Sequence, residues 1–358
     1  MERFQKLVIL DNIAMFAEER ARLQSLATEV VWVTRDLPKN IPNPPTGDQY
    51  CILPIRDAAQ LLPTLEGADA IITCWTPVGP EVLAGSPKLR YVGLWTNLWQ
   101  HRVEPADVIA RNIHVDYLPD YGTSVVPEYV FAGLLSMARR PHFHHQETRR
   151  GSWPYELLKT GRRRILSPED VDEWSLQGKN LGILGLGRIG SRVAEIALAF
   201  GMNVAYHSRS RKEGLEARGV SYLDLSNLCQ WSDVITIHLP PDVTGLIGRH
   251  ELGLMRDGTV VVNTASGCAI DQAALIEELR ASRLSAFLDV YEGLPPRREL
   301  KDLPNVLFSY RAAWFTRTSV KLKGKLLLDR MEAFLRGEPH AGCATLELSI
   351  SSASKNAP

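Results

Sequence analysis

The segment NLGILGLGRIGSRVAEIALAFGMNVAYHS, residues 180–208, decides the fold. It opens with an apolar run, breaks at three glycines, continues with apolar residues at helical spacing and closes with a second apolar run. This order predicts a strand, a tight turn, a helix and a parallel strand. In such a unit Gly185 permits the turn, Gly187 lets a dinucleotide pyrophosphate approach the backbone, and Gly190 lets the helix pack on the strand. The segment therefore predicts a Rossmann dinucleotide-binding unit.

Arg188 and Ile189 open the predicted helix, whose N-terminus would face the phosphates. A glycine turn with a purely structural role is the alternative. The end of the second strand selects between cofactors, because an acid there binds a ribose 2′-hydroxyl whereas arginine accommodates a 2′-phosphate. The chain has no acid there and reads Ser208-Arg209-Ser210-Arg211. We therefore expect NADP(H), with NAD(H) possible; the alternative is an ordinary solvated basic turn.

Apolar runs alternate with amphipathic stretches along the whole chain, from LVIL at 7–10 and AIITC at 70–74 to TVVVNTA and NVLFS near the end. Strands separated by helices form right-handed βαβ units and parallel sheets. The predicted fold class is α/β. The loop DLPKNIPNPPTGD, 36–48, is expected to be irregular, and the charged stretch 161–180 is expected to be a linker, an insertion or part of an active-site rim.

The length, charge balance and cysteine content of the chain limit the domains, metal sites and binding partners to be expected. A chain of 358 residues favours two domains, and its 41 basic and 41 acidic residues create no net field for nucleic acid or an anionic membrane. The five cysteines are scattered and odd in number, so neither a disulfide framework nor a zinc site is expected. No run is long enough to span a membrane, and no signal peptide is evident. We expect a cytoplasmic protein with a small-molecule substrate.

Six ordered segments beyond the glycine turn resemble the D-isomer-specific 2-hydroxyacid dehydrogenases, a family that includes glyoxylate and hydroxypyruvate reductases. Among them are YGTSVVPEYVFAGLLSMARR, HLPPDVTGLIG, VNTASGCAIDQAALIEELR and NVLFSYRAAWFTRTS. The resemblance implies a flavodoxin-like substrate domain, 1–117 completed by 316–345, and a Rossmann domain, 118–315. It further implies a homodimer built on the helix 129–140. Residues 346–358 are small and polar and are expected to be a disordered tail.

The resemblance also implies which residues lie beside the nucleotide. The positions that match the family on this side of the site are Gly185, Gly187, Gly190, His238, Pro240, Thr244, Thr264, Ala265 and Asp289. In the family, the residue at the Asp289 position contacts the nicotinamide carboxamide.

The family's catalytic side chains are absent from the matching positions. The substrate-binding Arg is replaced by Ser266, the Glu that orients the catalytic His by Leu294, and the Pro-His pair by Tyr310-Arg311. The family's threonine-glycine pair, whose amides hold a carboxylate, appears as Asn97-Leu98. We therefore expect nucleotide binding to persist while the substrate chemistry differs.

Three residues are candidates for the altered chemistry. Arg311 stays charged and cannot readily transfer a proton, but it could bind an anion or stabilise charge on oxygen; a domain-interface salt bridge is the alternative. Ser266 could donate a hydrogen bond or simply fill a turn. His101 is a titratable group near the expected cleft, although its position in the family usually starts a helix.

Asn97, Leu98, Trp99 and Trp314 are the candidate substrate-binding residues, with the tryptophans forming an apolar wall together with Trp95. For Trp95, packing in the core is the alternative. His142, His144 and His145 suggest a metal, but their spacing does not place them on one helix face, so no metal site is expected.

The sequence thus predicts an NADP(H)-dependent oxidoreductase whose substrate is not a simple 2-hydroxy or 2-keto acid. Two alternatives remain open. One is a non-redox enzyme that holds its nucleotide tightly, and the other is a catalytically silent nucleotide sensor or partner-binding protein.

Overall fold

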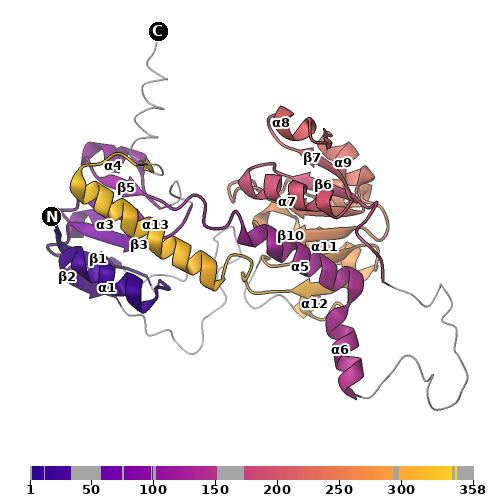
Figure 1. Ribbon diagram of the computed structural model, residues 1–358, viewed down its shortest axis with the longest axis horizontal. Coiled ribbons are helices and arrows are strands. Elements are labelled where there is room, and N and C mark those ends of the chain that lie inside the picture. Colours follow the sequence, from indigo (N-terminus) through magenta and orange to yellow (C-terminus); the bar gives the residue numbers. More distant parts are fainter. Residues whose placement is uncertain are drawn as a thin grey trace, which may run out of the picture. The chain divides into compact units, whose positions relative to one another are not determined.

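The computed structural model describes residues 2–11, 13–33, 58–74, 76–97, 99, 102–150, 173–292, 298–340 and 343–344. The chain forms two compact units, Met1–Tyr121 with Phe315–Pro358, and Gly122–Trp314 (Figure 1). Several sequence predictions lie outside the described residues: the loop 36–48, most of the stretch 161–180, Leu98, His101, Leu294 and the tail 346–358.

The first unit contains a five-stranded sheet in the order β2-β1-β3-β4-β5, and every pair of neighbouring strands is parallel. This order is that of flavodoxin-like folds. The strands are β1 (Phe4–Ile9), β2 (Ala27–Trp32), β3 (Ala70–Thr73), β4 (Tyr91–Leu94) and β5 (His114–Asp116).

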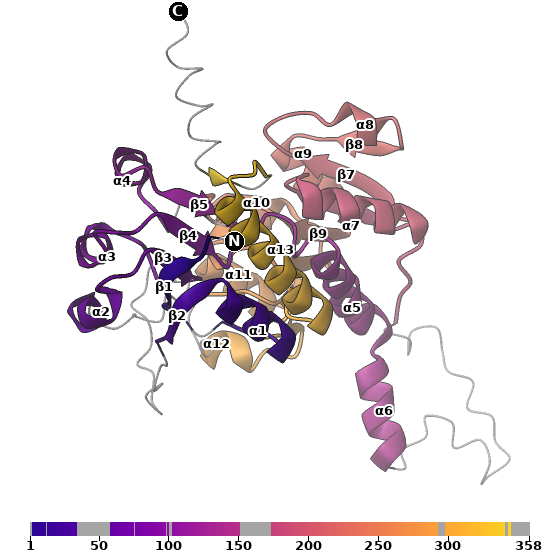
Figure 2. The same cartoon turned by 60° about the vertical axis from the view of Figure 1, so that its left-hand side comes forward.

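Helices cover both faces of this sheet. On one face Phe4 packs with Leu23 and Leu327, and on the other Val8 packs with Leu61 and Val82. Figure 2 shows the two helix layers on opposite sides of the strands. The first layer comprises α1 (Ala17–Ser25) and α13 (Arg317–Arg336), and the second α2 (Ala58–Leu65), α3 (Pro80–Gly85) and α4 (Pro105–Ala110). The C-terminal helix α13 therefore completes the N-terminal sheet.

The second unit contains a seven-stranded parallel sheet in the order β12-β11-β10-β9-β6-β7-β8. From β6 the sheet continues through β7 and β8 on one side and through β9, β10, β11 and β12 on the other, which is the Rossmann order. The predicted α/β class is confirmed. The strands are β6 (Asn180–Leu184), β7 (Asn203–His207), β8 (Val220–Tyr222), β9 (Val234–Ile237), β10 (Val260–Asn263), β11 (Ser285–Leu288) and β12 (Val306–Phe308). The strand order reverses between β6 and β9, where such folds bind ligands.

Buried apolar strands account for the layering of this unit. Every residue of β9 and β10 is buried, as expected for parallel strands covered on both faces. One face packs against α5 (Val125–Arg139) and α7 (Arg188–Ala199), and the other against α9 (Leu225–Trp231), α10 (Arg249–Leu254) and α11 (Gln272–Arg280). Shorter or peripheral elements are α6 (Pro141–Arg150), α8 (Glu213–Glu216), the 3₁₀ turn η3 (Gly267–Ala269) and α12 (Arg298–Lys301).

In the described part of the chain, every helix is too short or too polar to cross a lipid bilayer.

A substitution at Gly133 tests how tightly helix α5 packs on the sheet. A Cβ at this position would lie 2.1 Å from two ring carbons of Phe287 on β11. We therefore expect Gly133→Ala to destabilise the protein by about 1–3 kcal/mol, the usual cost of overpacking. Gly253→Ala, in exposed helix α10, is the matched control because a Cβ there meets nothing within 4 Å. Urea unfolding should show a lower midpoint only for the first variant, and equal midpoints would contradict this packing.

Candidate functional site

The glycine turn between β6 and α7 has the conformation that a nucleotide site requires. Gly185 adopts φ +92°, and a Cβ there would lie 2.5 Å from the carbonyl oxygen of His238. Gly190 begins the helix so close to β6 that a Cβ would lie 2.1 Å from the carbonyl oxygen of Gly185. Packing within the protein therefore accounts for these two glycines.

Gly187 differs from both neighbours. Its φ of −79° suits any residue, and a Cβ would meet no described atom within 4 Å. It is the N-cap of α7, and the amides of the first turn of an α-helix point out of the helix at this end. Open space above such amides fits a bound phosphate. Contacts with described atoms therefore do not require a glycine at 187.

The two arginines after β7 lie in different environments. Arg211 forms an ion pair with Glu216 at 2.5 Å, and this interaction, helped by the hydroxyl of Tyr206, lowers the pKa of Glu216 to about 2. Arg209 is exposed and makes no hydrogen bond or ion pair with another described residue. Ser208 donates its hydroxyl proton to the carbonyl oxygen of Ser210 at 2.6 Å, which closes the turn.

His238 follows β9 and stays neutral. Its Nε2 lies 3.0 Å from Oγ1 of Thr236, and burial lowers its pKa to about 3. The lowered pKa favours the neutral imidazole over the protonated form. Pro240 and Thr244 lie further along the same loop and are exposed.

The turn after β10 is held by Asn263. Its side-chain amide donates to the carbonyl oxygen of Ser266 at 2.7 Å, and its Oδ1 accepts from the amides of Ala265 and Ser266 at 3.1 and 3.3 Å. Thr264 lies within this turn, and its Oγ1 is buried without a hydrogen-bond partner among the described residues. A buried hydroxyl without a partner is costly, so a ligand that bonds to it would stabilise the site.

Ser266 is fully buried. Its Oγ lies 2.7 Å from Sγ of Cys268, and that thiol also lies 3.2 Å from the carbonyl oxygen of Pro241. The hydroxyl therefore faces the interior of the unit. This is the environment that the turn-filling alternative describes for Ser266.

Asp289, at the end of β11, organises the loop that carries Arg311. Its carboxylate accepts from the Ser309 hydroxyl at 2.5 Å and from the amides of Ala312 and Ala313 at 2.7 and 3.1 Å. Arg311 donates its backbone amide to the carbonyl oxygen of Asp289 at 3.0 Å and adopts a left-handed φ of +58°. The loop conformation thus depends on one buried carboxylate.

The candidate substrate-binding residues are divided between the two units. In the first unit Asn97 is exposed, whereas Trp99 is 8% exposed and Trp95 2%, so both rings pack in the hydrophobic core. Trp314 belongs to the second unit and is half-buried. Packing in the core therefore accounts for Trp95 and Trp99 without a ligand.

Comparison with known proteins identifies the family. A model of the NAD-binding domain of D-isomer specific 2-hydroxyacid dehydrogenases matches residues 131–310. The chain belongs to this family. It is similar to the glyoxylate reductase of Aeropyrum pernix, with 36% identity over 285 residues that cover 78% of this chain and 83% of that protein. It is also similar to the hydroxypyruvate reductase of Blautia hydrogenotrophica, with 28% identity over 80% of this chain and 88% of that protein.

The fold similarity extends over nearly the whole dehydrogenase. The crystal structure of the TT0316 protein from Thermus thermophilus matches with a TM-score of 0.75 and 29% identity, over 95% of this chain and 99% of that one. The chain is thus an NAD(P)-dependent oxidoreductase of the 2-hydroxyacid dehydrogenase family. The open space at Gly187 and the partnerless hydroxyl of Thr264 fit a nicotinamide dinucleotide.

Three side-chain interactions in this protein were not predicted from the sequence. Glu216 pairs with Arg211 five residues before it, and a carboxylate at that spacing was a usable signal. The hydrogen bonds from Asp289 to the Arg311 loop join residues more than twenty positions apart. His114, Asp116 and Cys343 lie together in the first unit, and no local pattern links them.

The glycine turn allows nucleotide binding to be separated from folding. We expect Gly187→Ala to leave the melting temperature unchanged, because its Cβ meets no protein atom, but to weaken NADPH binding by about tenfold or more through overpacking against the phosphates. Gly190→Ala should lower the melting temperature as well, because its Cβ meets the Gly185 carbonyl. Calorimetric titration and thermal unfolding measure both effects. Unchanged NADPH affinity in a folded Gly187→Ala protein would contradict this assignment of the site.

Proposed function

We propose that the protein is an NADP(H)-dependent oxidoreductase whose substrate is not a simple 2-hydroxy or 2-keto acid. The observation that carries this proposal is Arg311. The resemblance to the family matches Arg311 with the proton-transferring histidine, and Asp289 fixes the loop that carries it. A guanidinium remains protonated at any working pH, so the family's general acid is replaced by a permanent cation.

The exposed side chain of Arg209 supports the preference for NADP(H). A 2′-phosphate at the end of β7 would meet a guanidinium that no described residue already pairs. Arg211 is held by Glu216, and binding a phosphate would require that ion pair to open or to be shared. Arg209 is therefore proposed as the main 2′-phosphate ligand, with Ser208, Ser210 and Arg211 completing the turn.

Several groups are proposed to hold the nucleotide. The first turn of α7 binds the pyrophosphate, and His238, Pro240, Thr244, Thr264 and Ala265 lie at the carboxyl ends of β9 and β10, on the nicotinamide side. When bound, the cofactor supplies or accepts a hydride. Asp289 is already engaged by the Arg311 loop, so its proposed contribution is to position that loop.

The substrate is proposed to be an anion or to develop negative charge on oxygen, because Arg311 stabilises either through charge-assisted hydrogen bonds. Ser266 cannot replace the family's arginine as a carboxylate ligand, since its hydroxyl is buried against Cys268. If Arg311 replaces the family's histidine, the proton is proposed to come from water, from the substrate or from another residue. His101, outside the described residues, is the remaining candidate donor.

Two arginine variants test the proposed preference for NADP(H) over NAD(H). Arg209→Ala should reduce the ratio of NADPH to NADH affinity by about 10-fold to 100-fold, because one charge-assisted hydrogen bond contributes about 1.5–3 kcal/mol. Arg211→Ala should change the ratio by less than about fivefold, since Arg211 already pairs with Glu216. Fluorescence titration with both nucleotides measures the ratios. Equal affinities in the unmodified protein would overturn the NADP(H) preference.

Glyoxylate, hydroxypyruvate and pyruvate should be very poor substrates with either nucleotide. Loss of the general acid alone costs about 10²–10⁴-fold in rate, and loss of the carboxylate ligand weakens positioning further. Steady-state assays with the three acids test this. The combined change Ser266→Arg, Leu294→Glu and Arg311→His should recover activity only when Leu98→Gly is added to open the loop. A kcat near the ~10 s⁻¹ typical of enzymes in the unmodified protein would contradict the proposal.

We further propose that the protein works as a cytoplasmic homodimer, by analogy with its family, with the helix 129–140 at the interface. The corresponding element α5 is mostly buried within its own unit, but Glu128, Ala132 and Arg139 are exposed. Light scattering at micromolar concentration should give twice the chain mass. A monomer mass would count against the dimer.

A further inference from the structure

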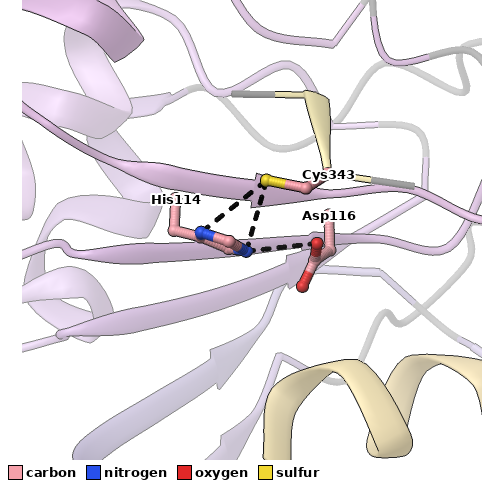
Figure 3. Close-up of side chains that lie close together, drawn as sticks. All are labelled: His114, Asp116 and Cys343. Carbon is pink, nitrogen blue, oxygen red and sulfur yellow. Dashed lines mark hydrogen bonds and ion pairs between the residues drawn. The ribbon is translucent and has the colours of Figure 1, made fainter. Parts of the chain in front are cut away.

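Three potential metal ligands from distant parts of the chain meet at the edge of the first sheet. His114 and Asp116 belong to edge strand β5, and Cys343 follows α13 (Figure 3). A single antiparallel bridge joins the backbones of Asp116 and Cys343. Asp116 is fully buried, Cys343 is 3% exposed and His114 is half-buried. All three ligand atoms lie within 4.8 Å of one another.

The spacing of these atoms fits a shared cation. Nε2 of His114 lies 3.6 Å from Sγ of Cys343 and 3.2 Å from Oδ1 of Asp116. Ligands at usual zinc distances in a tetrahedron stand about 3.6 Å apart for nitrogen and sulfur and about 3.3 Å for nitrogen and oxygen. Nδ1 of the same ring lies 3.8 Å from Sγ, so the sulfur is within reach of either ring nitrogen.

Two further side chains orient the carboxylate. His340 places Nε2 2.7 Å from Oδ1 of Asp116, and the Tyr91 hydroxyl donates to Oδ2 at 2.8 Å. Carboxylates that ligate metals are commonly held by such additional hydrogen bonds. His340 and Tyr91 are therefore positioning residues. The Cys343 thiol lies 3.6 Å from Nε2 and 3.8 Å from Nδ1 of His114.

We propose that His114, Asp116 and Cys343 bind one Zn²⁺ ion. Thiolate, imidazole and carboxylate together form a donor set that zinc accepts, and its two positive charges balance the thiolate and the carboxylate. The ion ties the segment after α13 to strand β5 across 229 residues of sequence and so protects an otherwise open sheet edge. No local motif links these three residues, and no metal site was expected from the sequence.

The proposed zinc site is tested on the full chain after chelation and reduction. Zn²⁺ should bind with a stoichiometry of one and raise the melting temperature. Co²⁺, used as a probe, should give a thiolate-to-cobalt charge-transfer band. Cys343→Ser should abolish this band and weaken Zn²⁺ binding by more than about 100-fold, which exceeds the 10–100-fold expected for His340→Ala as a positioning variant.

Cys74→Ser is the matched control, since Cys74 is another buried cysteine of the same unit and its thiol already donates to the carbonyl oxygen of Trp95. It should keep both the band and the affinity. Absence of the cobalt band in the unmodified protein, or equal Zn²⁺ affinity in Cys343→Ser, would overturn the proposal. Neither readout involves catalysis, so the result is independent of the proposed oxidoreductase function.

Discussion

The close approach of Gly190 to the carbonyl oxygen of Gly185 is the constraint on which the nucleotide-binding half of the protein depends. It brings the N-terminus of α7 to the carboxyl end of β6, and any side chain at 190 would push the helix away. The amides of the first helical turn can then face a phosphate group only because Gly187 leaves the space above them open. Because the strands of this sheet are parallel, the carboxyl ends of β7, β9, β10 and β11 lie along the same edge of the sheet as the carboxyl end of β6.

The other side of the site depends on a different interaction, the buried carboxylate of Asp289. It accepts from the loop 309–313 in three places and so holds Arg311 in a left-handed conformation. Asp289 thus fixes the loop that carries Arg311, and the hydroxyl of Ser266 is buried beside Cys268.

The fold could be predicted because its determinants are local. The apolar runs at 70–74 and 91–95 contain β3 and β4, and the glycine turn specifies its own strand, helix and strand within 29 residues. The environments of single side chains were harder to predict. Trp99 reads as a ligand-binding aromatic in sequence, whereas its ring packs in the core. Arg211 differs from Arg209 because it pairs with Glu216, five residues later. His114 and Cys343 meet only because α13 returns to the first sheet, a contact that no sequence window contains.

The central claim is that nucleotide binding is intact while the proton-transfer group of the family is absent. A stopped-flow single-turnover experiment tests it most directly, with NADPH bound to excess protein and then mixed with saturating glyoxylate. The account predicts that protein fluorescence reports the bound nucleotide while its absorbance decays at least about 100-fold more slowly than the ~10 s⁻¹ typical of enzymes. A rapid, complete loss of NADPH absorbance at that typical rate would contradict it.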